Sequence, residues 1–435
     1  MVTKINKPMN KYITFLIVLA NFTPIFAQEQ KTVIKFSGFI KNDYFFDSRQ
    51  TINIREGHFL LYPSEIITDS LGNDINARPT FNFLSIQSRI TATITGPDAF
   101  GAKTSGILEA DFFGNAGSGL DDVNGLRLRH AYTKLNWKHT ELLFGQTWHP
   151  FFNTNVFPGV ISFNTGVPFQ PFSRNPQLRI THKISNISIL FAALAQRDFT
   201  SPVSALTLRN AAIPDAQFQM QYQKKNDSLK TEIVSGFGLG YKTLVPRISS
   251  VNGLSTYAVN EKISSFSASV FGKIVTPKFT VKIYGTYGEN LFDLTLPGGY
   301  AIDSVSNTLT GARTYTANKN AAVWMELMSG GSRIQAGLFA GYTKNLGVNA
   351  KIMQSNLAQS QATIRGFNID NVYRISPRIM FISGKLNLAT ELEITTAAYA
   401  RKKQSGLYNI NEKGIVLSAY NTTNYRLLIA VIYHF

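Results

Sequence analysis

The chain has 435 residues and no cysteine, and 43 lysines and arginines against 26 aspartates and glutamates give it a formal net charge of +17. Only 16% of its residues are charged, against roughly 25% in soluble proteins, while 12% are aromatic. These figures and a mean hydropathy of −0.04 exclude a disulfide scaffold, a cysteine-bound zinc site and a bundle of membrane helices. Two classes of protein remain: a large secreted protein, or a membrane protein whose apolar and polar residues alternate.

The first segment is typical of an export signal. Residues 1–27 combine a basic start, with Lys4, Lys7 and Lys11, with a mostly apolar run that ends before Ala27, a small residue suited to cleavage. A membrane-anchoring helix is the alternative, but the run is shorter than the ~20 apolar residues that a spanning helix needs. We therefore expect cleavage near residue 27 and a mature domain over residues 28–435, outside the cytoplasm.

Beyond this segment, the recurring pattern is the alternation of apolar and polar residues. Ala216, Phe218 and Met220, for example, alternate with glutamines. A period of two places successive side chains on opposite faces of a β-strand. About sixteen such segments are predicted strands: 33–47, 82–97, 103–114, 125–138, 140–148, 176–185, 187–197, 215–225, 229–244, 261–276, 278–289, 318–329, 332–344, 370–383, 385–400 and 418–435.

The links between these segments alternate in length. Short links follow the even-numbered strands, as at positions 139, 186 and 384, and long ones follow the odd-numbered strands, as at 48–81 and 149–175. This layout predicts an all-β fold, a transmembrane antiparallel β-barrel with short periplasmic turns and long extracellular loops, in the outer membrane of a Gram-negative bacterium. A half-exposed antiparallel sandwich would show the same alternation of apolar and polar residues. One missed or spurious hairpin would change the number of strands to fourteen or eighteen.

The last strand carries an assembly feature. Phe435 ends the chain, and Tyr433, Val431 and Ile429 precede it at alternate positions. This pattern resembles the C-terminal signal by which the barrel assembly machinery recognises outer-membrane proteins. An ordinary edge strand that ends in phenylalanine is the alternative. We expect the assembly machinery to be one partner, and outer-membrane lipid and lipopolysaccharide to surround the barrel.

Polar residues on the inner face of a barrel set its selectivity. In the set that alternation turns inward, cations outnumber acids such as Glu109, Asp111 and Glu393. A ring of cations lowers the barrier for anions, and Arg127 and Arg129 are best placed because they share one strand face. The alternative is that these cations pair with lumen acids or lie at the rims. The predicted pore-lining residues are Arg89, Arg127, Arg129, Arg174, Arg179, Lys183, Arg374, Arg378 and Arg426.

The third long loop, 149–175, has no aspartate or glutamate but four prolines and six phenylalanines. Because so apolar a loop would be a poor exposed surface, we predict that it folds inward and narrows the lumen opposite the arginines. Packing of its rings on the inner wall or on a neighbouring subunit is an equal alternative. The residues expected to form the constriction are Trp148, His149, Phe151, Phe152, Phe163, Phe169 and Phe172.

Three motifs flank this loop or lie close to it in the chain. They are Gly145-Gln146-Thr147-Trp148, Arg174-Asn175-Pro176-Gln177-Leu178-Arg179 and Arg127-Leu128-Arg129-His130-Ala131-Tyr132. Together with Ile213-Pro214-Asp215 and Tyr287-Gly288-Glu289-Asn290-Leu291, they resemble the DcaP-like outer-membrane porins over much of residues 80–300, while the last third of the chain matches only in pattern. The resemblance implies sixteen strands, a homotrimer and passive diffusion of small anionic solutes such as dicarboxylates.

Two other classes compete with a porin. An outer-membrane enzyme of the lipase or protease type would need a nucleophile, a base and an orienting group. The six histidines are scattered singly, and His149, beside Trp148, is the one candidate. A structural or adhesion barrel would act through its loops, for which residues 59–62 of the first long loop offer an apolar contact with subunits or partners. We expect a channel rather than an enzyme.

Metal and nucleic-acid sites have little support in the sequence. No paired ligands stand at a useful metal spacing, although Asp69 with Asp74, or Asp121 with Asp122, would hold calcium weakly in a long loop. The high net charge would suit nucleic acid, but an exported chain does not meet it. We therefore expect neither a cofactor nor a nucleic-acid partner.

Overall fold

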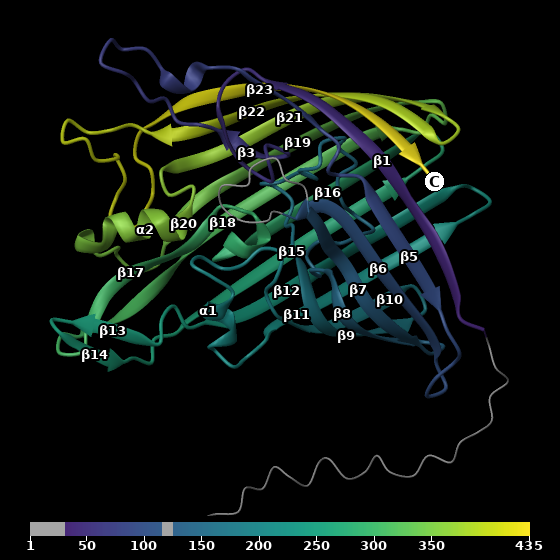
Figure 1. Ribbon diagram of the computed structural model, residues 1–435, viewed down its shortest axis with the longest axis horizontal. Helices are drawn as coiled ribbons and strands as arrows, with labels where there is room; N and C mark the ends of the chain where they lie inside the picture. Colours follow the sequence, from purple (N-terminus) through teal and green to yellow (C-terminus); the bar gives the residue numbers. More distant parts are fainter. Residues whose placement is uncertain (1–30, 115–124) are drawn as a thin grey trace, which may run out of the picture.

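The computed structural model describes residues 31–114 and 125–435. The expected signal peptide, 1–27, and the candidate calcium ligands Asp121 and Asp122 lie outside these residues. In the described part of the chain, no helix is long and apolar enough to cross a membrane. The architecture is dominated by long β-strands (Figure 1).

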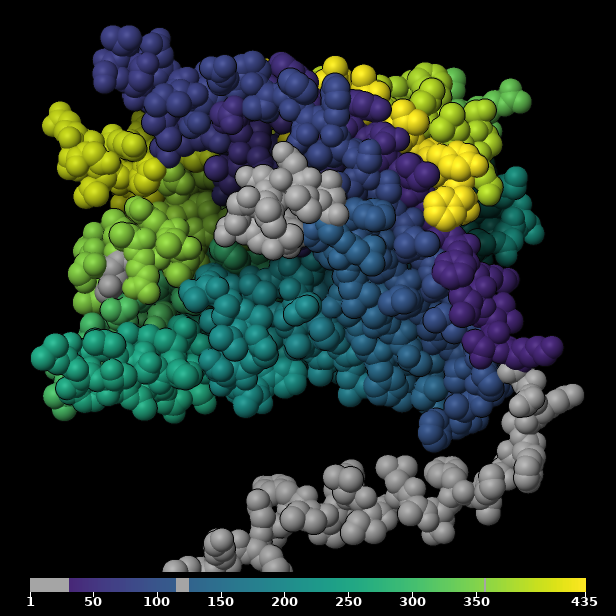
Figure 2. Space-filling model, viewed as in Figure 1, coloured from purple at the N-terminus to yellow at the C-terminus, as the bar shows by residue number. Residues whose placement is uncertain are grey.

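Sixteen antiparallel strands of the described residues close into a barrel. The last strand pairs with the first, from His434 opposite Phe39 to Arg426 opposite Asp47, so the yellow and purple ends of the chain lie side by side in Figure 2. Because the barrel is closed, the backbone N–H and C=O groups of each strand can form hydrogen bonds with a neighbouring strand. A sheet that crosses a bilayer requires this. The wall strands are β1 (Val33–Asp47), β4 (Thr80–Leu84) with β5 (Arg89–Thr95) as two parts of one strand, β6 (Lys103–Gly114), β7 (Gly125–Asn136), β8 (Thr140–Trp148), β9 (Arg174–Ile184), β10 (Ile187–Leu194), β11 (Asp215–Asn226), β12 (Thr231–Leu244), β15 (Ile263–Val275), β16 (Phe279–Glu289), β18 (Ala312–Ser329), β19 (Ile334–Val348), β21 (Ile369–Ser383), β22 (Leu386–Ala400) and β23 (Ala419–His434).

The predicted strands are confirmed, with local differences. The segment 82–97 is divided because residues 85–88 leave the sheet and Ile86 turns into the lumen, where it is buried in an apolar cluster. The predicted loop 290–317 contains an additional strand, β17 (Gly298–Asn307), which pairs with the start of β18. Tyr300 and Ile302 of β17 are buried, so tertiary contacts support this strand. The alternating stretch in its sequence was too short to predict it.

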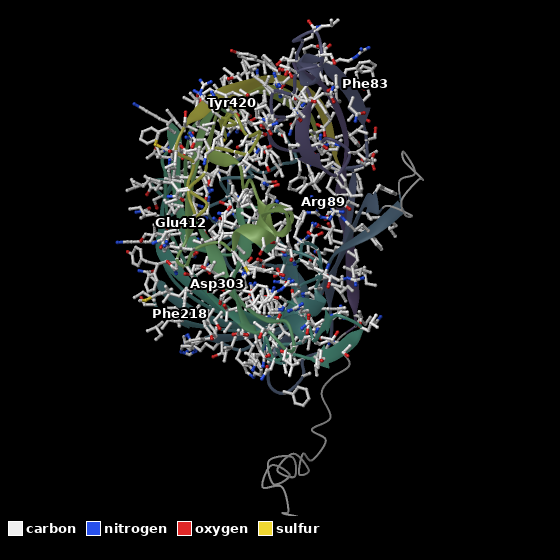
Figure 3. The ribbon with its side chains drawn as sticks, turned by 90° about the vertical axis from the view of Figure 1, so that its left-hand side faces the viewer. Phe83, Arg89, Phe218, Asp303, Glu412 and Tyr420 are labelled. Atoms are coloured by element: carbon white, nitrogen blue, oxygen red, sulfur yellow. The ribbon has the colours of Figure 1, made fainter. Side chains whose placement is uncertain are left out.

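The outer face of the wall is apolar. Outward side chains such as Leu239, Ile283 and Leu427 are about half exposed. Phe83 and Phe218 lie on the outside in the view from the loop end (Figure 3). Aromatic residues ring this face near both strand ends, as expected at the two membrane interfaces. They include Tyr241, Phe266, Tyr287, Tyr342, Tyr373 and Tyr425 toward the loops, and Tyr222, Phe279, Phe381 and Tyr433 toward the turns.

The apolar core lies inside the barrel, because long loops fold into it. We number the loops after the odd-numbered wall strands, so that L1 is 48–79, L3 is 149–173, L4 is 195–214, L6 is 290–311 and L7 is 349–368. The largest cluster joins Phe59 of L1 and Phe172 of L3 to Phe271, Trp324 and Phe339 of the inner wall. The loops carry β2 (Thr51–Ile54), β3 (Phe59–Pro63), η1 (Ile75–Ala77), α1 (Leu206–Arg209), β13 (Ser249–Asn252), β14 (Ser255–Ala258), η2 (Leu291–Leu294), η3 (Gln354–Asn356), α2 (Leu357–Thr363) and β20 (Ile364–Arg365).

Candidate functional site

The first long loop, L1, forms an inner layer of the barrel and not an exposed contact surface. Its strand β3 lies in the lumen, where residues 59–62 are all buried. Phe59 packs edge-on against Phe163 and Phe172 of L3. The hypothesis that residues 59–62 contact subunits or partners is therefore wrong, because their apolar surface is buried within the barrel itself.

L3 crosses the lumen, which confirms the inward fold predicted from its composition. The Ile161 and Ser162 amides donate to the Glu391 carboxylate at 2.6 and 2.9 Å. The Asn164 side chain donates to Glu393 at 2.6 Å. Both carboxylates belong to β22, across the barrel from β8 and β9, between which L3 lies. Charged acceptors make strong hydrogen bonds to backbone amides, so these contacts fix the middle of the loop.

The rings of L3 mostly pack on the inner wall, as the alternative interpretation expected, and do not face an open constriction. The buried rings are those of Phe151, Phe152, Phe163, Phe169 and Phe172. Trp148 and Phe152 are stacked with 4.0 Å between ring centroids and border a cavity described below. Three of the predicted constriction residues, Trp148, His149 and Phe152, thus line this cavity, while the buried phenylalanines form the core that holds L3 in place.

His149 belongs to the packing of L3. Its ring is buried, and Nδ1 accepts a hydrogen bond from the Phe151 amide at 3.1 Å. Nε2 lies 3.8 Å from the Asp215 carboxylate. The lone pair that a general base would use is thus engaged by the backbone, and His149 fixes the first turn of the loop.

Arg378 and Arg426, two of the predicted pore-lining residues, are buried in ion pairs. Arg426 binds both oxygens of Asp47, at 2.9 and 2.7 Å. Arg378 binds Glu326, which also accepts from Lys282 at 2.8 Å. Because both arginines are buried and paired with carboxylates, they offer little to a passing solute, and removing either one would leave a buried carboxylate without its partner.

Arg374 joins two loops to the wall. It donates to the backbone carbonyls of Leu60 in L1 and Val167 in L3, at 2.8 Å each. It also donates to the Thr395 hydroxyl at 2.7 Å and lies 3.4 Å from the Glu393 carboxylate. This predicted pore-lining residue is therefore a buried anchor for L1 and L3.

A separate arginine cluster lies between L1, β5 to β7, the start of β9 and L4. Arg127 and Arg129 both bind Asp111, at 2.6 and 2.8 Å. Arg129 also binds Glu109 at 2.7 Å, and Arg89 lies 3.4 Å from the same carboxylate. The described members of the cluster are Arg55, Arg89, Arg127, Arg129 and Arg174 with Glu109, Asp111 and Asp198. Among these described members, five guanidinium groups stand against three carboxylates.

Asp198 of L4 holds the outer part of this cluster together. Arg174 and Arg55 bind it at 2.7 and 3.0 Å, and Arg127 lies 3.6 Å away. Burial raises the pKa of Asp198, but the charges of Arg174, Arg55 and Arg127 outweigh burial and lower it to about 2. A carboxyl group with a lowered pKa stabilises the fold above its ordinary pKa, and this stabilisation is lost only as the pH falls toward 2.

Arg55 and Asp198 are functional candidates that the sequence pattern did not reveal. Both lie in long loops, where no alternation assigns a side chain to the lumen. Arg55 begins a turn of three residues with positive φ, at 60°, 55° and 87° for Arg55, Glu56 and Gly57. Gly57 is the one sequence signal of this turn, and it does not indicate where the arginine points.

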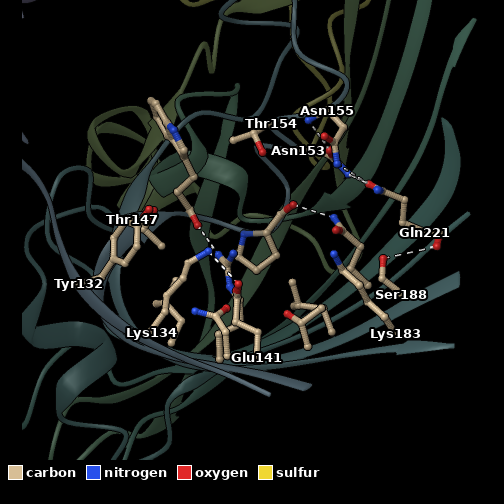
Figure 4. Close-up of a pocket in the computed structure, with 18 of the residues that line it drawn as sticks. Tyr132, Lys134, Glu141, Thr147, Asn153, Thr154, Asn155, Lys183, Ser188 and Gln221 are labelled. Carbon is tan, nitrogen blue, oxygen red and sulfur yellow. Dashed lines mark hydrogen bonds and ion pairs between the residues drawn. The ribbon is translucent and has the colours of Figure 1, made fainter. Parts of the chain in front are cut away.

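A cavity of 560 Å³ extends from the base of L3 toward the periplasmic turns (Figure 4). Arg179 and Lys183 line it from the inner face of β9. Arg179 donates to the Trp148 carbonyl at 2.7 Å. In the described part of the chain, neither Arg179 nor Lys183 has a carboxylate within 4.0 Å, whereas Lys134 and Glu141 pair at 2.9 Å. Both cations face the cavity, as the alternation predicted, and neither forms an ion pair among the described residues, although Glu109 and Glu141 also line the cavity.

The part of the cavity wall formed by L3 and β11 is polar but uncharged. Asn153 of L3 donates to Gln221 of β11 at 2.8 Å, and Asn155 donates to the same oxygen at 3.3 Å (Figure 4). Gln219 donates to the Pro150 carbonyl at 2.8 Å. These amides tie the base of L3 to β11 and fix this polar part of the cavity wall.

The calcium ligands considered in L1 serve the loop itself. Asp69 accepts hydrogen bonds from the Leu71 and Asn73 amides at 2.8 and 2.9 Å. Asp74 pairs with Arg49 at 3.0 Å. Across residues 31–114 and 125–435, no group of three or more histidine or carboxylate side chains is placed to hold a metal ion.

A model of the DcaP outer membrane protein family matches residues 6–234, slightly more than half of the chain. The chain belongs to the DcaP outer membrane protein family. This confirms the resemblance of the motifs around Trp148 and places the barrel in the outer membrane. The arginine cluster and both cavity cations lie within the DcaP-matched region. Among curated proteins, none matches the chain.

Solved structures share the fold of this DcaP-family chain. The outer membrane channel DcaP of Acinetobacter baumannii has a TM-score of 0.63 at 15% identity, covering 93% of this chain and 97% of that chain. In-vitro folded OmpT of Vibrio cholerae has a TM-score of 0.51 at 10% identity, covering 94% of this chain and 100% of that chain. Its trimer form has a TM-score of 0.52 at 9% identity and covers 93% and 100%. At these identities the likeness establishes the barrel fold.

Proposed function

We propose that this DcaP-family barrel is a channel for the passive diffusion of small hydrophilic solutes, preferentially anions such as carboxylates. The observation that carries the proposal is the pair of cations, Arg179 and Lys183, on the wall of the 560 Å³ cavity. Cations on a lumen wall lower the barrier for anion entry. The channel described for Acinetobacter baumannii DcaP, which has the same fold, supports a transport role.

The arginine cluster adjoins the same cavity. Trp148 borders the cavity, and its ring lies under the guanidinium groups of Arg129 and Arg174 at 5.7 and 5.1 Å. An anion on this side of the lumen would meet the surplus charge of the cluster and then Arg179 and Lys183. Several weak sites in succession favour conduction, because a solute can enter and still leave.

The proposed solute route uses a subset of the predicted cations. Arg374, Arg378 and Arg426 are excluded, because each is buried against loop carbonyls or carboxylates. The residues proposed to meet the solute are Arg89, Arg127, Arg179 and Lys183. Arg129 and Arg174 are proposed to act from behind them, because both are buried and paired with carboxylates. The constriction is proposed to lie where L1 and L3 narrow the lumen beside Trp148 and Phe152.

A hydrolytic function has less support at this site. His130 lies 3.1 Å from the Thr147 hydroxyl and 3.7 Å from the Glu109 carboxylate. This resembles the order of a catalytic triad, but 3.7 Å is too long for an orienting hydrogen bond. Glu109 is instead bound by Arg129 at 2.7 Å, so its charge is already compensated.

We further propose a homotrimer that is exported with a cleaved signal peptide over residues 1–27 and is surrounded by outer-membrane lipid and lipopolysaccharide. The trimer form of Vibrio cholerae OmpT, which has the same fold, supports the trimer. Phe435 continues the seam between the first and last strands, since its amide donates to the Gly38 carbonyl at 3.1 Å. Its half-exposed ring supports recognition of the last strand by the barrel assembly machinery.

Uptake of size-matched solutes into liposomes tests the charge preference. For the four-carbon solutes succinate, erythritol and putrescine, we expect entry rates to fall in this order. Replacing Arg179 and Lys183 together by alanine is expected to slow succinate roughly three- to tenfold relative to erythritol, since one charge at contact distance in water contributes about 1 kcal/mol. The measurement is the initial swelling rate of the proteoliposomes.

Lys385→Ala is the matched control for this pair of substitutions. Lys385 is exposed in the turn between β21 and β22, outside the cavity lining, so its loss changes the net charge but not the proposed route. The order of the three solutes should be unchanged in this variant. Faster entry of putrescine than of succinate into wild-type liposomes would refute the anion preference.

A further inference from the structure

Asp198 occupies the arginine cluster as a bound carboxylate would. The Arg174 guanidinium donates to Oδ2 through Nε and Nη2, at 3.1 and 2.7 Å. Arg55 donates to Oδ1 at 3.0 Å, and Arg127 lies 3.6 Å from the same oxygen. Arginines from β9, L1 and β7 thus surround both oxygens. This is a carboxylate-binding arrangement that the protein fills with its own loop L4.

Two of these arginines also have hydrogen-bond donors that Asp198 does not use. Arg174 Nη1 and Arg55 Nε are buried and have no hydrogen-bond acceptor among the described residues. The Arg174 side chain is only 1% exposed, so water does not readily serve these donors. A buried donor without a partner costs free energy. A ligand with more acceptor oxygens than one aspartate would satisfy them.

This arginine site is within reach of a solute. The side chains of Arg127 and Arg55 are 12% and 19% exposed, while Arg174 forms the buried back of the site. The Arg174 guanidinium lies over Trp148, which also borders the 560 Å³ cavity. The carboxylate site and the cavity are therefore neighbours on one side of the lumen.

Asp198 is carried by a loop and not by the barrel wall. Its own amide makes a long hydrogen bond, 3.4 Å, to the Arg174 carbonyl. The next residue along L4 toward β10, Arg197, is exposed. A rotation of the Asp198 side chain, with a small shift of this segment, would free the arginines without breaking a pairing between wall strands.

We propose that Asp198 is an internal ligand of a carboxylate-binding site formed by Arg55, Arg127 and Arg174, and that a permeating carboxylate solute binds by displacing it. The inference rests on the proposed anion channel and adds the place where the solute binds and the group with which it competes. Asp198 stays ionised until the pH approaches 2. Competition by the solute, and not protonation of Asp198, therefore opens the site.

Asp198→Asn tests this competition, because asparagine keeps the shape of the side chain and removes its charge. In planar bilayers containing the full chain, succinate is titrated against a chloride current and its block gives an apparent affinity. We expect succinate to bind about tenfold more tightly to the variant, as for a site that is free about one tenth of the time in the wild type. Asp370→Asn is the control, since it removes a carboxylate paired with Lys344, outside the arginine cluster. It should leave the block unchanged.

Unchanged or weaker block by succinate in Asp198→Asn would overturn the inference, and succinate passage through the wild type would then still support the channel. A wild type that excludes succinate altogether would instead overturn the proposed function. If Asp198→Asn does not form a folded barrel, Arg55→Gln combined with Asp198→Asn restores the local charge balance. This double variant should bind succinate more tightly than Arg55→Gln alone, and equal affinities would likewise overturn the inference.

Discussion

Replacing Arg374 by alanine is expected to destabilise the barrel by about 3–5 kcal/mol, because it removes the cation from a buried ion pair. The Arg374 side chain is 1% exposed and lies 3.4 Å from Glu393. The substitution also leaves the Leu60 and Val167 carbonyls without their donor, so L1 and L3 lose a shared anchor. The midpoint of urea unfolding in detergent, followed by circular dichroism, measures the loss.

Arg333→Ala is the matched control for this substitution. Arg333 is an exposed cation in the turn between β18 and β19. Its removal is expected to change stability by less than about 0.5 kcal/mol, as is usual for surface positions. Equal unfolding midpoints for the Arg374→Ala and Arg333→Ala proteins would contradict the anchoring role of Arg374. A stable Arg374→Ala barrel with steady single-channel currents would do so as well.

Gly341→Leu is expected to displace L3 and to raise single-channel conductance. Gly341 lies on β19 beneath the Phe169 ring, and a β-carbon there would be 2.4 Å from the Phe169 Cγ atom. No side chain fits unless this ring moves. Moving Phe169 out of its buried place would cost ~1.5–3 kcal/mol in lost apolar burial. We therefore expect a wider lumen and a lower unfolding midpoint together, measured by bilayer recording and urea unfolding.

Gly272→Leu controls for the loss of a glycine from a wall strand. Gly272 lies on β15, where a β-carbon would meet the Ile283 side chain at an ordinary 3.5 Å. Because Ile283 faces outward and is half exposed, the added leucine would lie on the lipid side. This variant should keep the wild-type conductance. If Gly341→Leu also kept it, L3 would not be the segment that narrows the lumen.

The wall of the barrel could be predicted from sequence because each strand separates lipid from lumen. The resulting alternation is repeated so often that the bounds of β6 and β8 agree with the predicted segments 103–114 and 140–148. The break in the second strand could not be predicted, since Ile86 keeps the alternating pattern while its backbone leaves the sheet. What places Ile86 is a cluster of loop and wall side chains that come together only in the fold.

The site could be predicted in part. Alternation correctly predicted that Arg179 and Arg374 point inward, but it did not predict their different surroundings. Arg179 borders a cavity, whereas Arg374 is buried under L1 and L3. In a barrel whose loops fill part of the lumen, an inward side chain is not always a pore-lining one. Arg55 and Asp198 reach the site from such loops. The loops have no alternation of apolar and polar residues from which the direction of a side chain could be predicted.

The preference for anions is the central claim, and the reversal potential of single wild-type channels tests it most directly. In a planar bilayer with a KCl gradient, the surplus cations of the arginine cluster and the cavity predict that chloride permeates faster than potassium. The zero-current potential should then have the sign set by chloride diffusion. A potential of the opposite sign, or the absence of stepwise conductance from purified protein, would contradict the account.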